Sequence, residues 1–215
     1  MKTKLILMLL IASTTAATAQ TAERKNRFLL GTYHKKDLNI NGLSAGVYSG
    51  YVSDEVRNVQ TNGIRLEAIG MGIISPLLPR SPISENESQY IATMASPVSE
   101  RINGLNLSPA GTLCDCITTG ISLGAIGQIS RQVNGISASI MINFAEKHNG
   151  LQLGMFNESY AMNGFQVGVS NYSARTRGLQ IGLFNGSKNL KGVQIGIWNT
   201  NQKRKLPILN WNFKD

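Results

Sequence analysis

Two cysteines one residue apart, Cys114 and Cys116, have the spacing best suited to chemistry in this sequence. In an oxidising compartment such a pair can form a disulfide, a redox centre or part of a metal site, although a metal would need further ligands. On a regular strand the two side chains lie on one face about 7 Å apart, which exceeds comfortable disulfide geometry, so a bridge requires a turn. The plainer interpretation is a local disulfide, or two partly buried thiols, in a loop between repeats.

The other reactive side chains form no recognisable constellation. His34 and His148 are isolated from each other and flanked by lysines, which predicts surface side chains and no metal site. A carboxylate pair for glycoside hydrolysis would come from the irregular part of the chain, where Glu85 and Glu87 lie, but nothing in their spacing favours it. Motifs of serine hydrolases, zinc proteases, P-loops and calcium loops are lacking. We therefore expect no enzyme, no cofactor and no metal.

A row of glutamines recurs at a fixed interval in the C-terminal third. Each lies in a segment that begins Gly-x-Gln-x-Gly and ends in Asn, and the leading glycines are 14 residues apart. Within one segment Leu179 and Ile181 point one way while Gln180 points the other, which is the alternation of a half-buried β-strand. The repeated glutamines are Gln152, Gln166, Gln180 and Gln194, and the repeated asparagines are Asn157, Asn171, Asn185 and Asn199.

We expect the aliphatic side chains of these strands to lie inside and the glutamine row to lie outside. Phe156, Phe184 and Trp198 would border that row. A flat strip of amides and glycines edged with aromatic rings is a candidate surface for an extended glycan. The alternative is structural, because side-chain amides stack into hydrogen-bonded ladders and glycines allow close packing.

Weaker copies of the segment extend the array toward the N-terminus. About ten copies cover residues 40 to 213, with a degenerate last copy at 206–212. A proline-containing stretch at 75–100 interrupts the array and predicts a long loop, so helix content should be near zero. The leading glycines of the weaker copies are Gly42, Gly63, Gly104, Gly120 and Gly135.

An all-β fold of tandem repeats of about 14 residues has three architectures open to it. The favoured one is a parallel β-solenoid, in which like residues stack and the asparagines form a ladder at a corner. An antiparallel meander or closed barrel also fits the spacing, and it would separate Arg177, Lys191 and Lys205, which share one phase. An outer-membrane barrel is the third, although three alternating aliphatics are short for its apolar band.

The N-terminus predicts export. Lys2 and Lys4 precede a short apolar run, and Ala17-Thr18-Ala19 resembles a signal-peptidase site, so residues 1–19 are expected to be a cleaved signal peptide. Residues 20–215 would form a single β-repeat domain, with its most regular repeats at 150–213. Of 215 residues, 42% are hydrophobic and only 15% charged, which argues against a disordered acidic chain or a coiled coil.

Basic residues gather between the C-terminal repeats. A positive edge there would attract anionic envelope polysaccharide or lipid headgroups, whereas an exported chain without a nucleic-acid motif is not expected to bind nucleic acid. The alternative is a solvated edge that keeps the protein soluble. The residues concerned are Arg175, Arg177, Lys188, Lys191, Lys203, Arg204 and Lys205.

The repeats resemble those of an uncharacterised bacterial surface-repeat family, whose members carry a signal peptide and tandem Asn-Gly-aliphatic-Gln-aliphatic-Gly segments. This resemblance implies an exported envelope or surface protein and no known reaction. The 14-residue unit is also similar to the β-roll heads of trimeric autotransporter adhesins, although the stalk and anchor of those proteins are lacking here. We therefore expect a non-catalytic protein of the periplasm, outer membrane or cell surface, with a structural or adhesive role.

Overall fold

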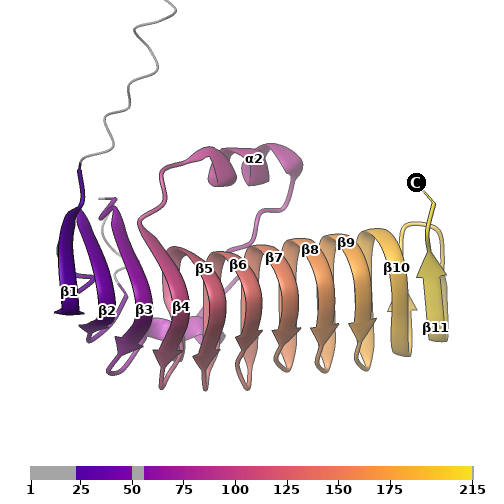
Figure 1. Cartoon of the computed structure of the whole chain (residues 1–215). Coiled ribbons are helices and arrows are strands. Elements are labelled where there is room, and N and C mark those ends of the chain that lie inside the picture. Colours follow the sequence, from indigo (N-terminus) through magenta and orange to yellow (C-terminus); the bar gives the residue numbers. More distant parts are fainter. Residues whose placement is uncertain (1–22, 50–55, 215) are drawn as a thin grey trace, which may run out of the picture.

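The strands of the protein stack into one straight row of coils, as the computed structural model shows for residues 23–49 and 56–214 (Figure 1). One 11-stranded sheet runs in chain order, and every neighbouring pair is parallel except the last. This pairing selects the parallel β-solenoid from the three expected architectures. The strands are β1 (Lys25–Gly31), β2 (Leu38–Gly46), β3 (Val59–Glu67), β4 (Glu100–Ser108), β5 (Leu113–Gly124), β6 (Gly127–Ala138), β7 (Ile142–Leu153), β8 (Phe156–Val167), β9 (Ser170–Ile181), β10 (Phe184–Thr200) and β11 (Lys205–Asn212). The predicted signal peptide lies outside the described residues.

The leading glycines of the repeats are aligned in register from β2 to β10, which confirms the predicted copies over this range. At this position the chain bends from one face of the coil to the next. Gly178 has φ +138°, and a Cβ there would lie 2.0 Å from the carbonyl oxygen of Gly164. Only glycine fits such a stacked corner. The additional strand β1 was not recognised in the sequence, because it has Leu29 where the other strands have glycine.

The C-terminal segment is not a further coil. The strand β11 pairs antiparallel with β10 and so ends the parallel array, which corrects the prediction of a last degenerate copy. Lys205 therefore does not continue the row in which Arg177 and Lys191 are direct neighbours. The side chain of Arg177 is exposed, so water screens the repulsion that had favoured a meander.

The stretch between β3 and β4 contains helix as well as loop, which corrects the prediction of a long loop and of almost no helix. It holds the 3₁₀ helix η1 (Met71–Leu77) and the α-helix α2 (Glu87–Ala95). Asn86 caps α2 by accepting a hydrogen bond from the backbone NH of Gln89, whose side chain in turn accepts one from the NH of Glu85. This reciprocal arrangement is a capping box, and its residues were a signal in the sequence.

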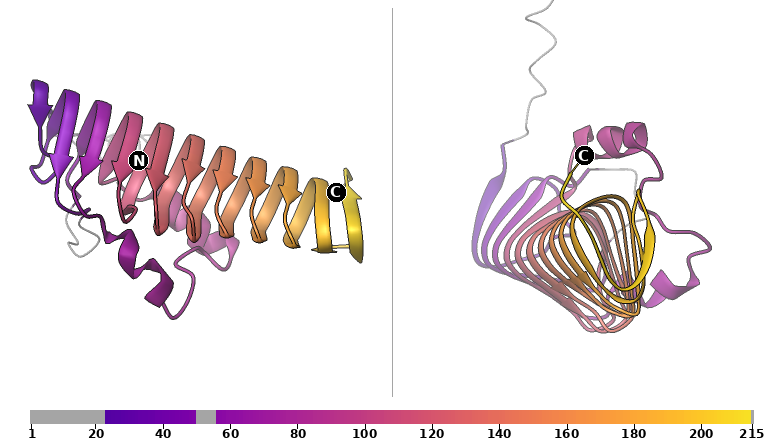
Figure 2. Two further views of the ribbon diagram at one scale, coloured as in Figure 1. Left: turned by 90° about the horizontal axis from the view of Figure 1, so that it is seen from below. Right: turned by 90° about the vertical axis from the view of Figure 1, so that its right-hand side faces the viewer.

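The insertion covers one outer face of the middle coils, where α2 stands off the strands above β5 to β7 (Figures 1 and 2). Tyr90 of α2 stacks on Tyr160 of β8 with their ring centroids 4.3 Å apart. Glu87 forms an ion pair with Arg175 of β9. These contacts hold the insertion against strands that lie far from it in the sequence.

The inward face of the glutamine repeats is polar, which corrects the expectation that their aliphatic side chains lie inside. Other inward positions are apolar, such as those of Met162 and Leu190. Gln152, Gln166, Gln180 and Gln194 are all fully buried, and so are the repeated asparagines to within a few per cent. The aliphatic residues between them are half-buried or exposed. The coil is narrow and its residues repeat, so each inward amide lies directly beside an identical amide and can satisfy both its donor and its acceptor.

Candidate functional site

The glutamine row is a structural ladder inside the protein. Each glutamine side chain donates to the one before it, as in the bond of 2.7 Å from Gln180 Nε2 to Gln166 Oε1. The hydroxyl of Ser173 donates to the same oxygen at 3.0 Å. A glycan therefore cannot reach these amides, and the predicted ligand strip is wrong in its glutamine part. The aromatic part is exposed, since Phe156, Phe184 and Trp198 keep about half of their surface in water.

The repeated asparagines form a second ladder, which confirms the predicted structural role. The side chain of Asn157 donates to that of Asn171 at 2.8 Å, and the same bond joins each following pair up to Asn199. The same amide nitrogens also donate to carbonyl oxygens at the strand ends, such as that of Val167 at 2.9 Å. The ladder thus holds the turn of each coil closed.

Cys114 and Cys116 form a disulfide. Their Cα atoms are 5.3 Å apart, less than on a regular strand, because the pairing of β5 with β6 shifts register between Cys114 and Ile117. This bulge supplies the turn that the bridge was expected to need. Both cysteine side chains are buried and pack on Ile102. A buried disulfide is not accessible to a thiol partner, so its role is structural rather than redox.

His148 is buried rather than on the surface as expected, whereas His34 is exposed. His148 Nε2 lies 2.9 Å from the hydroxyl of Ser137, which donates to Asn143 at 2.9 Å. Burial lowers the pKa of His148 to about 4, so its ring is neutral near pH 7. Because the one proton of the Ser137 hydroxyl goes to Asn143, His148 Nε2 donates to Ser137 and does not act as its base. Both side chains are buried in the core, so we assign them a structural role.

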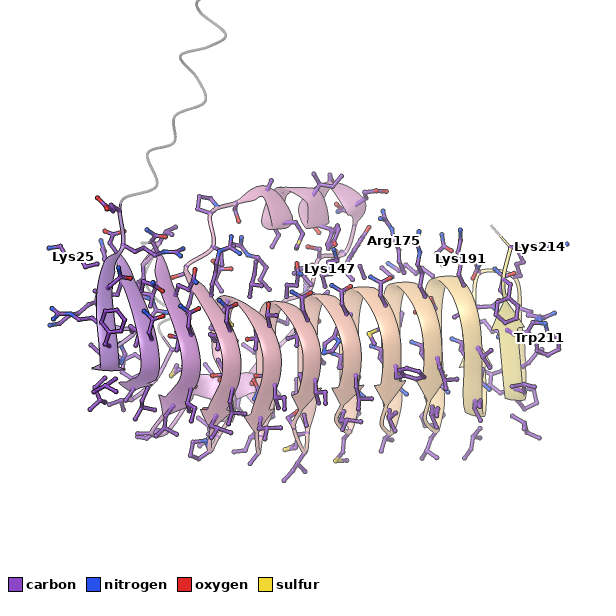
Figure 3. The ribbon with its side chains drawn as sticks, in the orientation of Figure 1. Lys25, Lys147, Arg175, Lys191, Trp211 and Lys214 are labelled. Atoms are coloured by element: carbon purple, nitrogen blue, oxygen red, sulfur yellow. A yellow bond between two sulfur atoms is a disulfide. The ribbon has the colours of Figure 1, made fainter. Side chains whose placement is uncertain are left out.

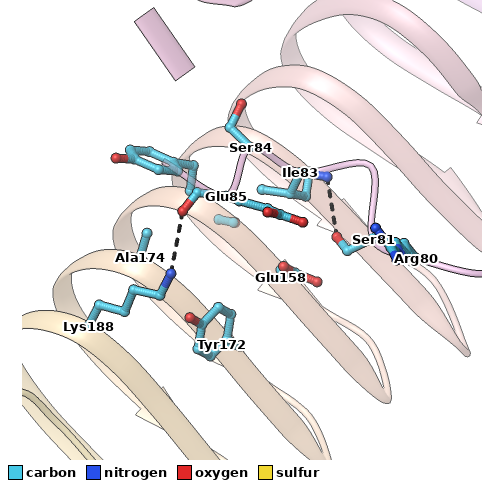
Figure 4. A pocket seen from close by; sticks show the side chains of 11 residues that line it. Arg80, Ser81, Ile83, Ser84, Glu85, Glu158, Tyr172, Ala174 and Lys188 are labelled. Atoms are coloured by element: carbon cyan, nitrogen blue, oxygen red, sulfur yellow. Dashed lines mark hydrogen bonds between the residues drawn. The ribbon is translucent and has the colours of Figure 1, made fainter. Parts of the chain in front are cut away.

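A polar cleft of about 470 Å³ lies between the insertion and the outer face of β8–β10 (Figure 4). Glu158, Tyr172 and Lys188 line its floor, and the segment from Arg80 to Glu85 forms its other wall. Burial raises the pKa of Glu158, while a hydrogen bond from Ser81 opposes that rise. Lys188 Nζ donates to the backbone oxygen of Glu85 at 3.4 Å, which partly bridges the two walls.

The carboxylates considered for catalysis do not face one another in this cleft. Glu85 lines it, whereas Glu87 forms an ion pair with Arg175. The neighbouring carboxylate that the sequence did not single out, Glu146, is held by the backbone NH of Ser84 at 3.0 Å and by its hydroxyl at 2.9 Å. Burial raises the pKa of Glu146 as well.

An apolar edge runs along the turns that follow the strands, and the side chains on it are exposed or half-buried. Two outward rows flank a line of small residues, and both rows contain only apolar side chains. The first row is Leu66, Leu107, Leu123, Ala138, Leu153, Val167, Ile181 and Ile195, and register pairing connects each member to the next. The second row is Pro109, Ala125, Ile140, Met155, Val169, Leu183 and Ile197. We call these two rows the apolar edge.

Two shallow hollows of about 670 and 690 Å³ lie on this edge, one over the middle coils and one over the C-terminal coils. In the second hollow Gly168, Gly182 and Gly196 form the floor between the aliphatic rows. A Cβ on Gly182 would lie 2.5 Å from the side-chain nitrogen of Asn171, so the ladder inside keeps this floor free of side chains. The same amide bonds that close the coil thus shape the surface outside it.

The basic side chains lie at the opposite edge of the coils. In Figure 3 Lys147, Arg175 and Lys191 point to the upper edge, whereas the strand ends that carry the apolar edge point downward. Arg175 and Arg177 lie within β9, and Lys188 and Lys191 lie within β10, so these residues are on strands rather than in the predicted turns between them. Charge and apolar surface are therefore separated on the two sides of the solenoid.

A buried charge cluster near the N-terminal coils was missed in the sequence. The guanidinium of Arg65 is fully buried and donates to Glu100 at 2.7 Å, to Glu67 at 3.0 Å and to Asn106 at 2.9 Å. Its plane lies 4.0 Å from the ring centroid of Tyr33. Arg65 occupies the inward position that carries glutamine in later coils, and it is enclosed on all sides, so the cluster is a core element.

Comparison with protein-family models, with curated proteins and with solved structures finds no match to this chain. The resemblance to a surface-repeat family therefore stays a prediction. Among the residues that the structure describes, no helix has both the length and the apolar character needed to cross a membrane.

Proposed function

We propose that this protein is an exported, non-catalytic component of the cell envelope with an adhesive role, in which the apolar edge makes the contact. The apolar edge is the observation that supports the proposal. A surface of this length without charge is unusual for a soluble monomer and commonly marks an interaction site. The reactive groups of the core, in contrast, are enclosed by the coils and have structural partners.

The core is compatible with such a role because the cohesion between neighbouring coils does not depend on the outer aliphatic residues. The amide ladders hold neighbouring coils together from inside, so the outer positions are available for contact. Such a rod presents the same side chains at regular steps of about 4.8 Å, which suits attachment along a line.

The proposal is tested by expressing the chain in a bacterium and fractionating the cells. We expect mass spectrometry of the envelope fraction to find a chain that begins at Gln20, as the predicted cleavage after Ala19 requires. We also expect replacement of Ile140 and Leu183 by serine to release the protein from washed envelopes, whereas replacement of the exposed Arg177 by serine would not. An unprocessed chain in the cytoplasm, or equal retention of both variants, would refute the proposal.

Glycan binding is the second candidate function. Its candidate site is the polar cleft beneath the insertion, because the glutamine row is buried. The cleft combines an exposed ring, Tyr172, with the charged groups of Arg80, Glu158 and Lys188, which is the mixture that holds sugars. Loss of glycan-array binding in Tyr172→Ala would support this function. The control is Tyr48→Ala, an exposed tyrosine in the turn that follows β2, which should keep the binding. An array without any signal would remove it.

A further inference from the structure

The apolar edge is too long for a single small ligand. Its first row runs through eight consecutive strands from β3 to β10, and with about 4.8 Å between strands it extends for about 34 Å. The two hollows lie on different parts of the same edge rather than at one site. The partner must therefore offer apolar contact over the whole length of the solenoid.

The shape of the edge favours the hydrocarbon chains of lipids over a folded protein as its partner. The two rows lie on opposite flanks of the turn, with the glycines between them, so the contact surface wraps around a rounded rim (Figure 2). Side chains on this rim project well into water, as Ile140 and Ile197 show with 66% and 62% of their surface exposed. Hydrocarbon chains can close around both flanks, whereas a protein would need a matching channel of the same length.

The residues beside the edge have the composition of a membrane interface. Phe156, Phe184 and Trp198 follow directly on the second row, on the side where the coil becomes polar. Tryptophan is enriched at the level of lipid headgroups, between hydrocarbon and water, and Trp198 has this position, whereas the two phenylalanines extend the apolar surface. The basic residues lie at the far edge, so attraction to anionic headgroups is not what would bring the apolar edge to a surface.

We propose that the partner of the apolar edge is a lipid bilayer, into whose interfacial layer the rim of the solenoid dips along its length. This inference rests on the proposed adhesive function and names its partner. The protein would lie on the membrane as a monomer with its axis parallel to the surface. Binding would come from burial of aliphatic side chains and would not depend on the charge of the lipid.

Tryptophan fluorescence of the full chain reports the contact at the edge itself. The described chain has Trp198 beside the edge and Trp211 stacked on Arg204 in β11, so Trp211→Phe leaves a single reporter. With vesicles of phosphatidylcholine alone, we expect a blue shift of Trp198 emission and protection from a water-soluble quencher. The predicted signal peptide contains no tryptophan, so its own affinity for lipid does not produce this signal. Unchanged emission at saturating lipid would overturn the proposal.

Flotation of variants on the same vesicles tests which side of the solenoid binds. Ile140→Glu with Leu183→Glu should lower the vesicle-bound fraction at least about tenfold, because each change removes an exposed aliphatic side chain that the bilayer would bury and adds a charge. Arg177→Glu with Lys205→Glu changes the net charge twice as much on exposed residues away from the edge and should bind like the parent. The serine pair Ile140→Ser with Leu183→Ser, checked by circular dichroism, keeps the test valid if the glutamates prevent folding.

The outcomes separate this inference from the proposed function. Loss of vesicle binding in the edge variants, but not in the charge variant, supports the bilayer as partner. A parent chain that is dimeric in sedimentation, becomes monomeric in the edge variants and ignores vesicles would show that a second copy covers the edge. Retention on envelopes that depends on the edge, without vesicle binding, would overturn the bilayer and keep the adhesive function. If the edge variants change neither retention nor vesicle binding, both are wrong.

Discussion

Replacing a ladder glutamine by leucine should destabilise this protein, although the same change stabilises many hydrophobic cores. Gln166 is fully buried and takes part in three good hydrogen bonds, to Gln152 at 2.8 Å, from Gln180 at 2.7 Å and from Ser173 at 3.0 Å. Their loss costs about 1 kcal/mol each, and the buried hydroxyl of Ser173 left without an acceptor costs about 1–3 kcal/mol more.

Leucine recovers part of this loss, up to about 2 kcal/mol, because it is more apolar than glutamine. We therefore expect Gln166→Leu to lower the free energy of unfolding by about 2–4 kcal/mol. The matched change on the outside is Ile197→Thr, at a position with 62% of its surface exposed, where we expect a loss below about 1 kcal/mol. The expected order is opposite to that of a protein with its aliphatic residues inside.

Equilibrium unfolding in urea, followed by far-ultraviolet circular dichroism, measures both variants. The slope of the transition should be compared with that of the parent, because a stacked array can unfold in parts and the free energy then has no single value. A Gln166→Leu chain as stable as the parent, together with a large loss in Ile197→Thr, would refute the inside-out arrangement.

Three further perturbations test other parts of the core. Gly178→Ala should cost more than about 3 kcal/mol or prevent folding, because the new Cβ would meet the backbone of Gly164 at a φ of +138°. The control Gly186→Ala places its Cβ near the ring of Tyr172 and should cost less than about 1 kcal/mol, and equal melting temperatures of the two variants would contradict the stacked corner. His148 has a pKa of about 4 in the folded chain against 6.5 ordinarily, so the parent should lose stability as the pH falls from 6.5 toward 4, by up to about 1.4 kcal/mol per pH unit. His148→Met, which copies the aligned Met162, should remove this pH dependence in thermal melts, and a dependence that persists would show that another group is responsible. Arg65→Met should cost about 3–5 kcal/mol because it leaves Glu67 buried without a counter-charge and Glu100 with Arg57 alone, while Arg177→Met on the surface should cost less than about 0.5 kcal/mol. The double change that also makes Glu67 glutamine should restore much of the loss, since Glu100 keeps its ion pair with Arg57; no recovery in urea midpoints would argue against an electrostatic origin.

The repeat spacing predicted the strands and favoured parallel coils over a meander or barrel, and the structure confirms the coils. If the strands are parallel, residues at one phase stack, and the structure aligns Gly150, Gly164 and Gly178 in this way. Which face is inward did not follow, because alternation identifies two faces without saying which one is enclosed. The deciding signal was the constancy of Gln and Asn beside aliphatic positions that vary between Leu, Val, Ile and Phe.

The candidate site could be predicted only in part. Phe156, Phe184 and Trp198 were singled out as contact residues and lie exposed beside the apolar edge, but the edge itself was assigned to the core. The polar cleft depends on the insertion folding back over β8–β10, a contact between residues far apart in sequence, such as Ser84 and Glu146. The bridge from Cys114 to Cys116 needed the bulge in β5, which no local pattern indicates.

The two amide ladders point in opposite directions along the solenoid axis. Asparagine side chains donate toward the C-terminus, as from Asn171 to Asn185, whereas glutamine side chains donate toward the N-terminus, as from Gln180 to Gln166. Aligned dipoles that all point one way, as in an α-helix, accumulate partial charge at their ends. Here the two buried arrays oppose each other, so their dipoles offset one another as the rod lengthens by whole turns. A third and more exposed row donates toward the N-terminus, as from Asn163 to Asn149.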